Sequence, residues 1–126
     1  MLKYIHCDQA PKAIGAYHPA VQTGNLVFLS GQLGLEPSTG EMISQDFCLQ
    51  THQAFKNLRA VCQSAGGDLS NLVKVNVFLS DMANFSDFNT IMMEYFPDKK
   101  YPARSAIACL ALPRNGLVEV EGILSL

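Results

Sequence analysis

Two helical patterns placed among short apolar stretches constrain the fold of this chain more than any other feature of its sequence. The first helix is predicted to begin at Ser44, a candidate N-cap, and to end at Gly66-Gly67. The second begins at Asp81 or Asn84 and ends at Pro97, because a helix interior does not tolerate proline. Both carry an apolar stripe at helical spacing, which indicates core packing. The stripes are Phe47, Phe55, Leu58, Cys62 and Ala65 in the first helix and Phe85, Phe88, Met92 and Tyr95 in the second.

The apolar stretches around these helices predict β-strands. A short strand runs from Leu2 to His6, and Gly24-Asn25 separates two apolar stretches, of which the second is Leu26 to Leu33. A Gly-Asn pair between apolar stretches is typical of a hairpin turn. A brief strand is expected near Met42, after a turn rich in Pro, Ser and Gly. Leu72 to Leu79 alternates as a half-buried strand does, with one face made of Val73, Val75, Val77 and Leu79.

The last third of the chain predicts a second hairpin, in which the strands SAIACLAL and LVEVEGILSL flank the turn PRNG. The element order is then β-β-β-α-β-α-β-β, which predicts an α+β protein. We expect a mixed sheet with both helices on one face and an apolar opposite face that neighbouring subunits cover. The sequence has no internal repeat and no linker, so residues 1–126 are expected to form a single domain.

The low content of charged residues also predicts an oligomer. The chain has 9 Lys and Arg and 11 Asp and Glu, and these residues are 16% of the sequence, against about 25% in an ordinary soluble domain. Apolar residues make up 48%, so a monomer would leave much apolar surface in contact with water. Some of that surface is expected to contact another subunit.

Charge and residue spacing disfavour several classes of function. The net charge of −2, with no basic run beyond Lys99-Lys100, gives no general surface for binding nucleic acid. No apolar stretch is long enough to span a membrane, and the first residues lack the apolar core of a secretory signal, so we expect a cytoplasmic protein. The four cysteines and three histidines are scattered without the spacing of a metal site, and the cysteines are expected to be reduced, mostly buried thiols.

Polar residues inside apolar strands are the candidates for a functional site. Arg104 follows Pro102 at the start of an apolar strand, where its guanidinium needs an anionic partner. The alternative is an arginine that is exposed or forms an interface salt bridge. Ser30, Gly31 and Gln32 follow another apolar run, and Gly31 allows the backbone to approach a ligand closely. A bulge at the strand end explains this glycine equally well.

Glu119 and Glu121 form the third candidate. They are two residues apart in a predicted strand and therefore lie on the same face of it. Two such carboxylates can share acid and base work, or one of them can pair with Arg104 across the predicted hairpin. The alternative is a solvent-facing row on an edge strand, which protects that edge against aggregation.

Four segments together resemble one known family across essentially the whole chain. They are QAPKAIGAY, LVFLSGQLG, KVNVFLSDMANFSDFN and YPARSAIACLALPRNGLVEVEGI. The chain is identified by them as similar to the Rid (reactive intermediate deaminase, YjgF-like) family. The resemblance implies a chorismate-mutase-like α+β fold and a homotrimer in which the sheets form a central β-barrel, with clefts between subunits. It also implies cofactor-free hydrolysis of 2-imino acids, such as 2-iminobutanoate and 2-iminopropanoate, to 2-keto acids and ammonia.

The resemblance also assigns roles to residues of this chain. Arg104 is expected to hold the substrate carboxylate with two parallel hydrogen bonds, and Glu119 to orient or activate the attacking water. Backbone groups around Gly31 and Ala106 would hold the water and the imine nitrogen. Tyr17, Ser30 and Asn89 match positions that line the cleft.

The same resemblance implies no metal and no cofactor, and it leaves two alternatives open. Well-known bacterial members have a cysteine where this chain has Ala106, so only the backbone of that residue can contribute. One alternative is a non-catalytic trimer that binds 2-keto acids or regulates through the same cleft. The other is the RNA-cleaving inhibition of translation attributed to some relatives, which the acidic composition does little to support.

Overall fold

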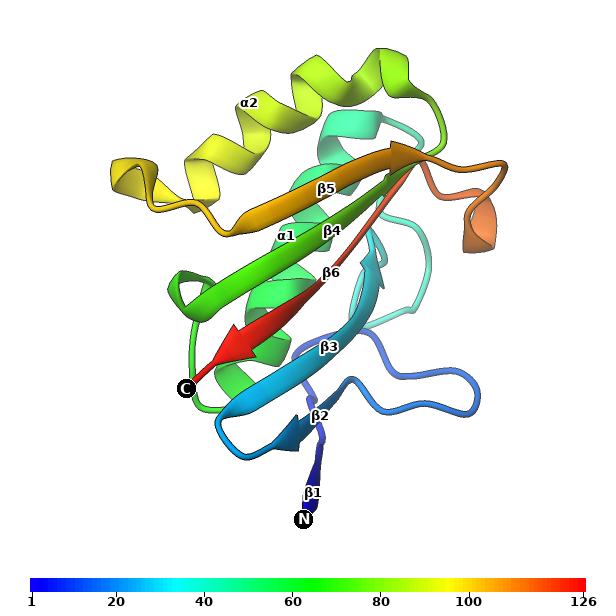
Figure 1. Cartoon of the computed structure of the whole chain (residues 1–126). Coiled ribbons are helices and arrows are strands. Elements are labelled where there is room, and N and C mark those ends of the chain that lie inside the picture. Colours follow the sequence, from blue (N-terminus) through cyan, green and yellow to red (C-terminus); the bar gives the residue numbers. More distant parts are fainter.

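A computed structural model describes all of residues 1–126 and arranges them around one six-stranded sheet (Figure 1). Two helices, α1 (Phe47–Ser64) and α2 (Phe85–Tyr95), accompany the sheet. The spatial order of the strands is β1-β2-β3-β6-β4-β5. The element order and the mixed α+β sheet agree with the prediction. The strands are β1 (Leu2–Ile5), β2 (Ala20–Thr23), β3 (Leu26–Leu33), β4 (Leu72–Leu79), β5 (Ala103–Ala108) and β6 (Val118–Ser125).

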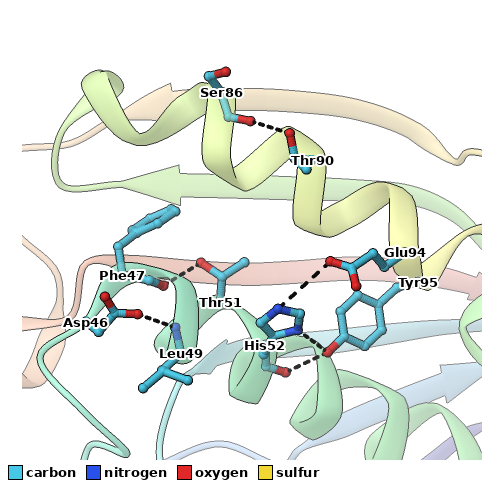
Figure 2. Close-up of polar contacts among 9 residues, drawn as sticks. All are labelled: Asp46, Phe47, Leu49, Thr51, His52, Ser86, Thr90, Glu94 and Tyr95. Atoms are coloured by element: carbon cyan, nitrogen blue, oxygen red, sulfur yellow. Dashed lines mark hydrogen bonds and ion pairs between the residues drawn. The ribbon is translucent and has the colours of Figure 1, made fainter.

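The first helix begins two residues later than a cap at Ser44 would place it. The carboxylate of Asp46, whose backbone is extended, accepts a hydrogen bond from the Leu49 amide at 2.9 Å (Figure 2). Ser44 instead supports the approach to the helix, because its hydroxyl accepts from the Asp46 amide and its carbonyl from the Gln50 side chain. The predicted cap is therefore wrong, and Asp46 is the N-cap.

The second helix follows a 3₁₀ turn at Met82–Asn84, which Asp81 caps through the Ala83 amide. Helix α2 itself begins at Phe85 with Asn84 in the N-cap position, so the α-helix starts at the second of the two predicted positions. Helix α2 is fixed to α1 by a polar contact, in which the Tyr95 hydroxyl lies 2.8 Å from His52 Nδ1 (Figure 2). The other ring nitrogen of His52 lies 4.0 Å from the carboxylate of Glu94. These contacts matter for the site, because α2 carries side chains that position Arg104.

The core lies between the helices and one face of the sheet, with α1 behind the sheet in Figure 1. Phe55 is fully buried at its centre, and its ring stacks on Tyr95 with the ring centroids 4.9 Å apart. Its ring also packs against Phe88 and Phe96. Burying an aromatic side chain of this kind stabilises the fold by about 2–3 kcal/mol.

No helix of the chain combines the length and the apolar character that crossing a membrane requires.

The predicted C-terminal hairpin is wrong. Strand β5 pairs in parallel with β4, and β6 lies between β3 and β4, antiparallel to both. The crossover through α2 makes β5 parallel to β4 and leaves it at the edge of the sheet. The chain then passes the end of β4, where the Cys109 amide donates to Leu79 O and the Ser80 amide donates to Leu117 O, and returns as β6 on the other side.

Two local expectations about strands also fail. The β4–β6 register shifts between Leu72 and Lys74, and this irregularity leaves Val73 48% exposed instead of on the buried face. The segment near Met42 forms only an isolated bridge to Leu35, not a strand.

The face of the sheet away from the helices, which we call the open face, is mixed in character rather than apolar. Residues on β4, β5 and β6 alternate, so those that flank the buried valines point to this face. The predicted apolar face is therefore wrong for the middle of the sheet, where carboxylates lie beside aromatic and aliphatic side chains. The open face carries Phe28, Lys74, Asn76, Phe78, Ser105, Ile107, Glu119, Glu121 and Ile123.

The close packing of β3 on α1 can be tested at Gly34. A Cβ at this position would lie 2.6 Å from Gln50 O, so Gly34→Ala forces the added methyl group against the backbone of α1. We expect a loss of about 2 kcal/mol in the free energy of unfolding, measured by chemical denaturation. The control is Gly40→Ala, which has a left-handed φ of 74° but no atom within 4 Å of the added methyl group. It should lose only about 1 kcal/mol, and equal losses in both variants would contradict the packing argument.

Candidate active site

Glu119 lies in the middle of the sheet, on the open face of β6. It stands opposite Phe78 of β4 and Leu33 of β3, so it is not on an edge strand as the alternative interpretation assumed. Burial and, to a lesser degree, the neighbouring Glu121 raise the pKa of Glu119 above its ordinary value. The carboxylate of Glu121 accepts a hydrogen bond from the side-chain Nδ2 of Asn76 at 3.2 Å, whereas the Glu119 carboxyl has no hydrogen bond or ion pair within the chain. Glu119 is therefore a half-buried carboxyl group whose oxygen atoms accept no hydrogen bond from the rest of the chain.

Gly31 makes room for this carboxyl group. The β3–β6 register shifts between Leu29 and Gln32, which is a bulge at the strand end. A Cβ on Gly31 would lie 2.9 Å from Glu119 Cδ, closer than real Cβ atoms come to a neighbour. The interpretation of this glycine as part of a bulge is confirmed, and the bulge brings the Gly31 backbone directly against the Glu119 side chain. The approach of this backbone to a ligand stays a prediction.

Ser30 connects β3 to the long loop that precedes β2. Its hydroxyl donates to His18 O at 2.6 Å, and its amide donates to Pro19 O at 2.9 Å. These bonds hold the loop that contains Tyr17, whose side chain is 49% exposed. Tyr17, Ser30, Gly31 and Glu119 line one cavity of about 580 Å³. Four of the predicted site residues thus meet within a single chain.

Arg104 lies elsewhere, on β5 beneath α2. Its Nη1 donates to Asn89 Oδ1 at 2.8 Å and lies 3.5 Å from Met92 Sδ, while the guanidinium carbon is 5.2 Å from the centre of the Phe85 ring. No carboxylate of the chain lies within 4.0 Å of it. Neutral groups thus orient the guanidinium and leave its charge uncompensated. It opens into a second cavity of about 470 Å³, which Asn89, Met92 and Met93 also line, together with Tyr101 and Pro102.

The predicted site residues therefore form two separate groups. Arg104 pairs with Val75 and so points to the helix side of the sheet, where Ala106, opposite Val77, also points. Glu119 points to the open face, and β4 lies between its strand and that of Arg104. The proposed pairing of Arg104 with Glu119 or Glu121 across a hairpin is wrong, because the two strands are not neighbours.

Sequence reasoning missed two cations in the cavity of Glu119. Lys12 lies in the loop before β2, and Arg114 lies in the turn before β6. The sequence places both in polar loop segments, and nothing in their spacing indicates that they share a cavity with Glu119. The four cysteines are free, and no three His, Cys, Asp or Glu side chains are grouped as a metal site requires.

The chain is thus a small α+β protein that carries a carboxyl group and a guanidinium in two separate cavities. A family model described as Endoribonuclease L-PSP matches residues 7–125, and the chain belongs to this family, which includes the Rid and YjgF-like proteins.

Some relatives are named for an activity, and others are named only for their family. A 2-iminobutanoate/2-iminopropanoate deaminase of Dermatophagoides farinae is 42% identical over 121 residues, which cover 96% of this chain and 94% of that protein. A RutC family protein of Pyrococcus horikoshii is 40% identical over 123 residues, covering 98% of this chain and 97% of that protein. The crystal structure of RidA from the Antarctic bacterium Psychrobacter sp. has a TM-score of 0.94 and 43% identity, covering 98% of this chain and 99% of that one.

The titration of Glu119 can be tested with Glu121→Gln. Removing the neighbouring charge should lower the pKa of Glu119, but the pKa should stay above that of an exposed glutamate because burial is the larger cause. Carboxyl-carbon NMR across a pH titration measures this directly. A pKa of Glu119 at or below the ordinary value in the unsubstituted protein would contradict the account.

A stability measurement gives the same test a second readout. The raised pKa means that the folded state binds the proton more tightly than the unfolded state, so ionisation destabilises the fold. The cost is absent below the unfolded-state pKa and grows as the pH rises through the folded-state pKa. Glu119→Gln should therefore gain stability relative to the unsubstituted protein at neutral pH and lose that advantage near pH 4, as followed by thermal unfolding.

Proposed function

We propose that this protein is an imine deaminase, which hydrolyses 2-imino acids such as 2-iminobutanoate and 2-iminopropanoate to 2-keto acids and ammonia. The observation that carries the proposal is the pair of complementary groups, an uncompensated guanidinium at Arg104 and an unpartnered, half-buried carboxyl group at Glu119. A 2-imino acid carries a carboxylate, which a guanidinium binds, beside a C=N carbon that water attacks. The name of the Dermatophagoides farinae relative supports the same reaction.

We further propose that the working site forms between copies of the chain in a homotrimer whose sheets make a central barrel. Arg104 and Glu119 cannot meet within one chain, because they lie on opposite faces of the sheet. A neighbouring copy that brings its β5 edge to the open face would complete the site. Apolar side chains exposed around these strands support such a contact, since Phe28 is 47% exposed, Ile107 53% and Leu110 fully exposed.

Binding in this site is expected to begin at Arg104. Asn89 engages only Nη1, which leaves Nε and Nη2 free of intrachain bonds. Two parallel hydrogen bonds to the substrate carboxylate would then fix the position of the imine carbon. A lysine at this position would keep the charge but lose the two-pronged geometry. Asn89 and Met92 are positioning residues in this account.

The chemical step needs one water molecule and no oxidant or reductant. The water oxygen bonds to the imine carbon while the Glu119 carboxylate takes one water proton and passes it to the imine nitrogen, which gives a neutral carbinolamine. Glu119 then takes the hydroxyl proton and delivers it to the nitrogen as the carbon–oxygen double bond forms and the carbon–nitrogen bond breaks, so ammonia leaves, a 2-keto acid remains and Glu119 is again ionised. The raised pKa of Glu119 suits it for moving protons in both directions nearer neutral pH. Backbone groups of Gly31 and Ala106, together with Ser30 and Tyr17, would line the space for water and substrate.

The proposal is tested by forming 2-iminobutanoate in place with an amino-acid oxidase and timing the appearance of 2-ketobutyrate. The unsubstituted protein should accelerate the reaction, and Arg104→Ala should lose about 100-fold or more of that acceleration because the substrate carboxylate is no longer held. Arg104→Lys should fall between them. Lys56→Gln, an exposed change on α1 outside both cavities, is the control and should retain full activity.

Four outcomes would overturn this assignment in whole or in part. No acceleration by the unsubstituted protein contradicts the deaminase, and equal acceleration by Arg104→Ala contradicts the role of Arg104 in it. Tight binding of 2-ketobutyrate without turnover favours the non-catalytic binding protein. Salt-sensitive cleavage of RNA in the absence of deamination favours the ribonuclease.

A further inference from the structure

The cavity that contains Glu119 also holds two cations for which the proposed reaction has no use. Lys12 and Arg114 line it, from the loop before β2 and from the 3₁₀ turn Pro113–Asn115 before β6. Both segments lie at the same side of the sheet in Figure 1. Although Glu119 and Glu121 line the same cavity, neither cation has a carboxylate of the chain within 4.0 Å. Their charges are therefore available to a ligand.

The backbone holds Arg114 in a strained conformation. Arg114 has φ of 59° and Asn115 has φ of 56°, and left-handed backbone is uncommon for a residue such as arginine. Such strain persists only where the surrounding structure fixes it, and it is concentrated at functional positions.

Several contacts fix this turn. The Gly116 amide donates to Pro113 O at 3.0 Å, and a Cβ on Gly116 would lie 2.8 Å from Leu33 Cδ2. The Leu117 amide donates at 2.9 Å to Oε1 of Gln50, a side chain that is 2% exposed on α1. The turn is thus tied to both β3 and α1, so the base of the Arg114 side chain has a defined place at the cavity.

We propose that Arg114, assisted by Lys12, forms a second anion-binding subsite in this cavity, and that the preferred ligands are dicarboxylic 2-imino and 2-keto acids. The inference rests on the proposed function, in which Arg104 of a neighbouring copy takes the carboxylate beside the imine. The distal carboxylate of the ligand then lies against Arg114. A cavity of about 580 Å³ is in the range that accommodates ligands larger than a four-carbon acid.

The charges of the cavity are consistent with this placement. Of the two carboxylates that line the cavity, Glu121 accepts a hydrogen bond from the Asn76 side-chain amide, and neither lies within 4.0 Å of Lys12 or Arg114. A monocarboxylic ligand would leave Arg114 without an anionic partner, whereas a dicarboxylic ligand supplies one. Selectivity for the longer ligand therefore comes from a cation that is already positioned and unpaired.

Isothermal titration calorimetry with 2-ketobutyrate and 2-ketoglutarate tests the subsite. The unsubstituted protein should bind 2-ketoglutarate more tightly than 2-ketobutyrate. Arg114→Gln should reduce the ratio of the two affinities by about 10-fold, the effect of losing one charge-assisted hydrogen bond. Arg114→Lys, which keeps the charge, should retain most of the ratio, and the exposed control Lys56→Gln should leave it unchanged.

Other results would overturn the subsite. An unsubstituted protein without preference for 2-ketoglutarate, or an Arg114→Gln variant with an unchanged ratio, contradicts it. Dissociation of the oligomer by Arg114→Gln, seen by light scattering, would assign Arg114 to a contact between copies instead. Deamination of 2-iminobutanoate without any dicarboxylate preference contradicts only the proposed subsite. Dicarboxylate binding without any deamination contradicts only the proposed reaction.

Discussion

The position of β6 in the middle of the sheet is the constraint on which the rest of the structure depends. This strand pairs on both sides, with β3 and with β4, so its register is fixed twice. Val118, Val120 and Leu124 are fully buried against the helices, and the alternate residues must then face away from them. Slipping the strand by one residue would bury carboxylates and expose valines. The core thereby determines where Glu119 points, and its raised pKa follows from that half-buried position.

Local patterns in the sequence predicted the helices and strands of this fold. They did not predict which strands pair with one another. The alternation of β4 and the apolar stripes of both helices report short-range periodicity, which depends only on nearby residues. The neighbours of β5 and β6 depend on the crossover through α2, and no local signal in PRNG distinguishes a hairpin from a passage around β4. A single register irregularity reversed the prediction for Val73.

The candidate site shows the same division between residue identity and arrangement. Arg104, Glu119 and Gly31 stand out in the sequence because charged or glycine residues interrupt apolar strands. The sequence does not show which of these residues lie together, because that depends on the face of the sheet to which each side chain points. The contact of Gly31 with Glu119 follows from a bulge, and the isolation of Arg104 from both glutamates follows from β4 lying between them. The group around Arg104 offers an oriented cation without an anionic partner. The group around Glu119 offers a carboxyl group without a hydrogen-bond partner.

The central claim, that one copy supplies Arg104 and another supplies Glu119 to the same site, is tested most directly by mixing two inactive variants. Arg104→Ala and Glu119→Gln would be unfolded together in equal amounts, refolded, and assayed for release of 2-ketobutyrate from 2-iminobutanoate. Random trimers should have both native groups in about a quarter of their sites, so about a quarter of the unsubstituted activity should return. Activity no greater than the sum of the two separate variants, in refolded mixed trimers, would contradict the claim.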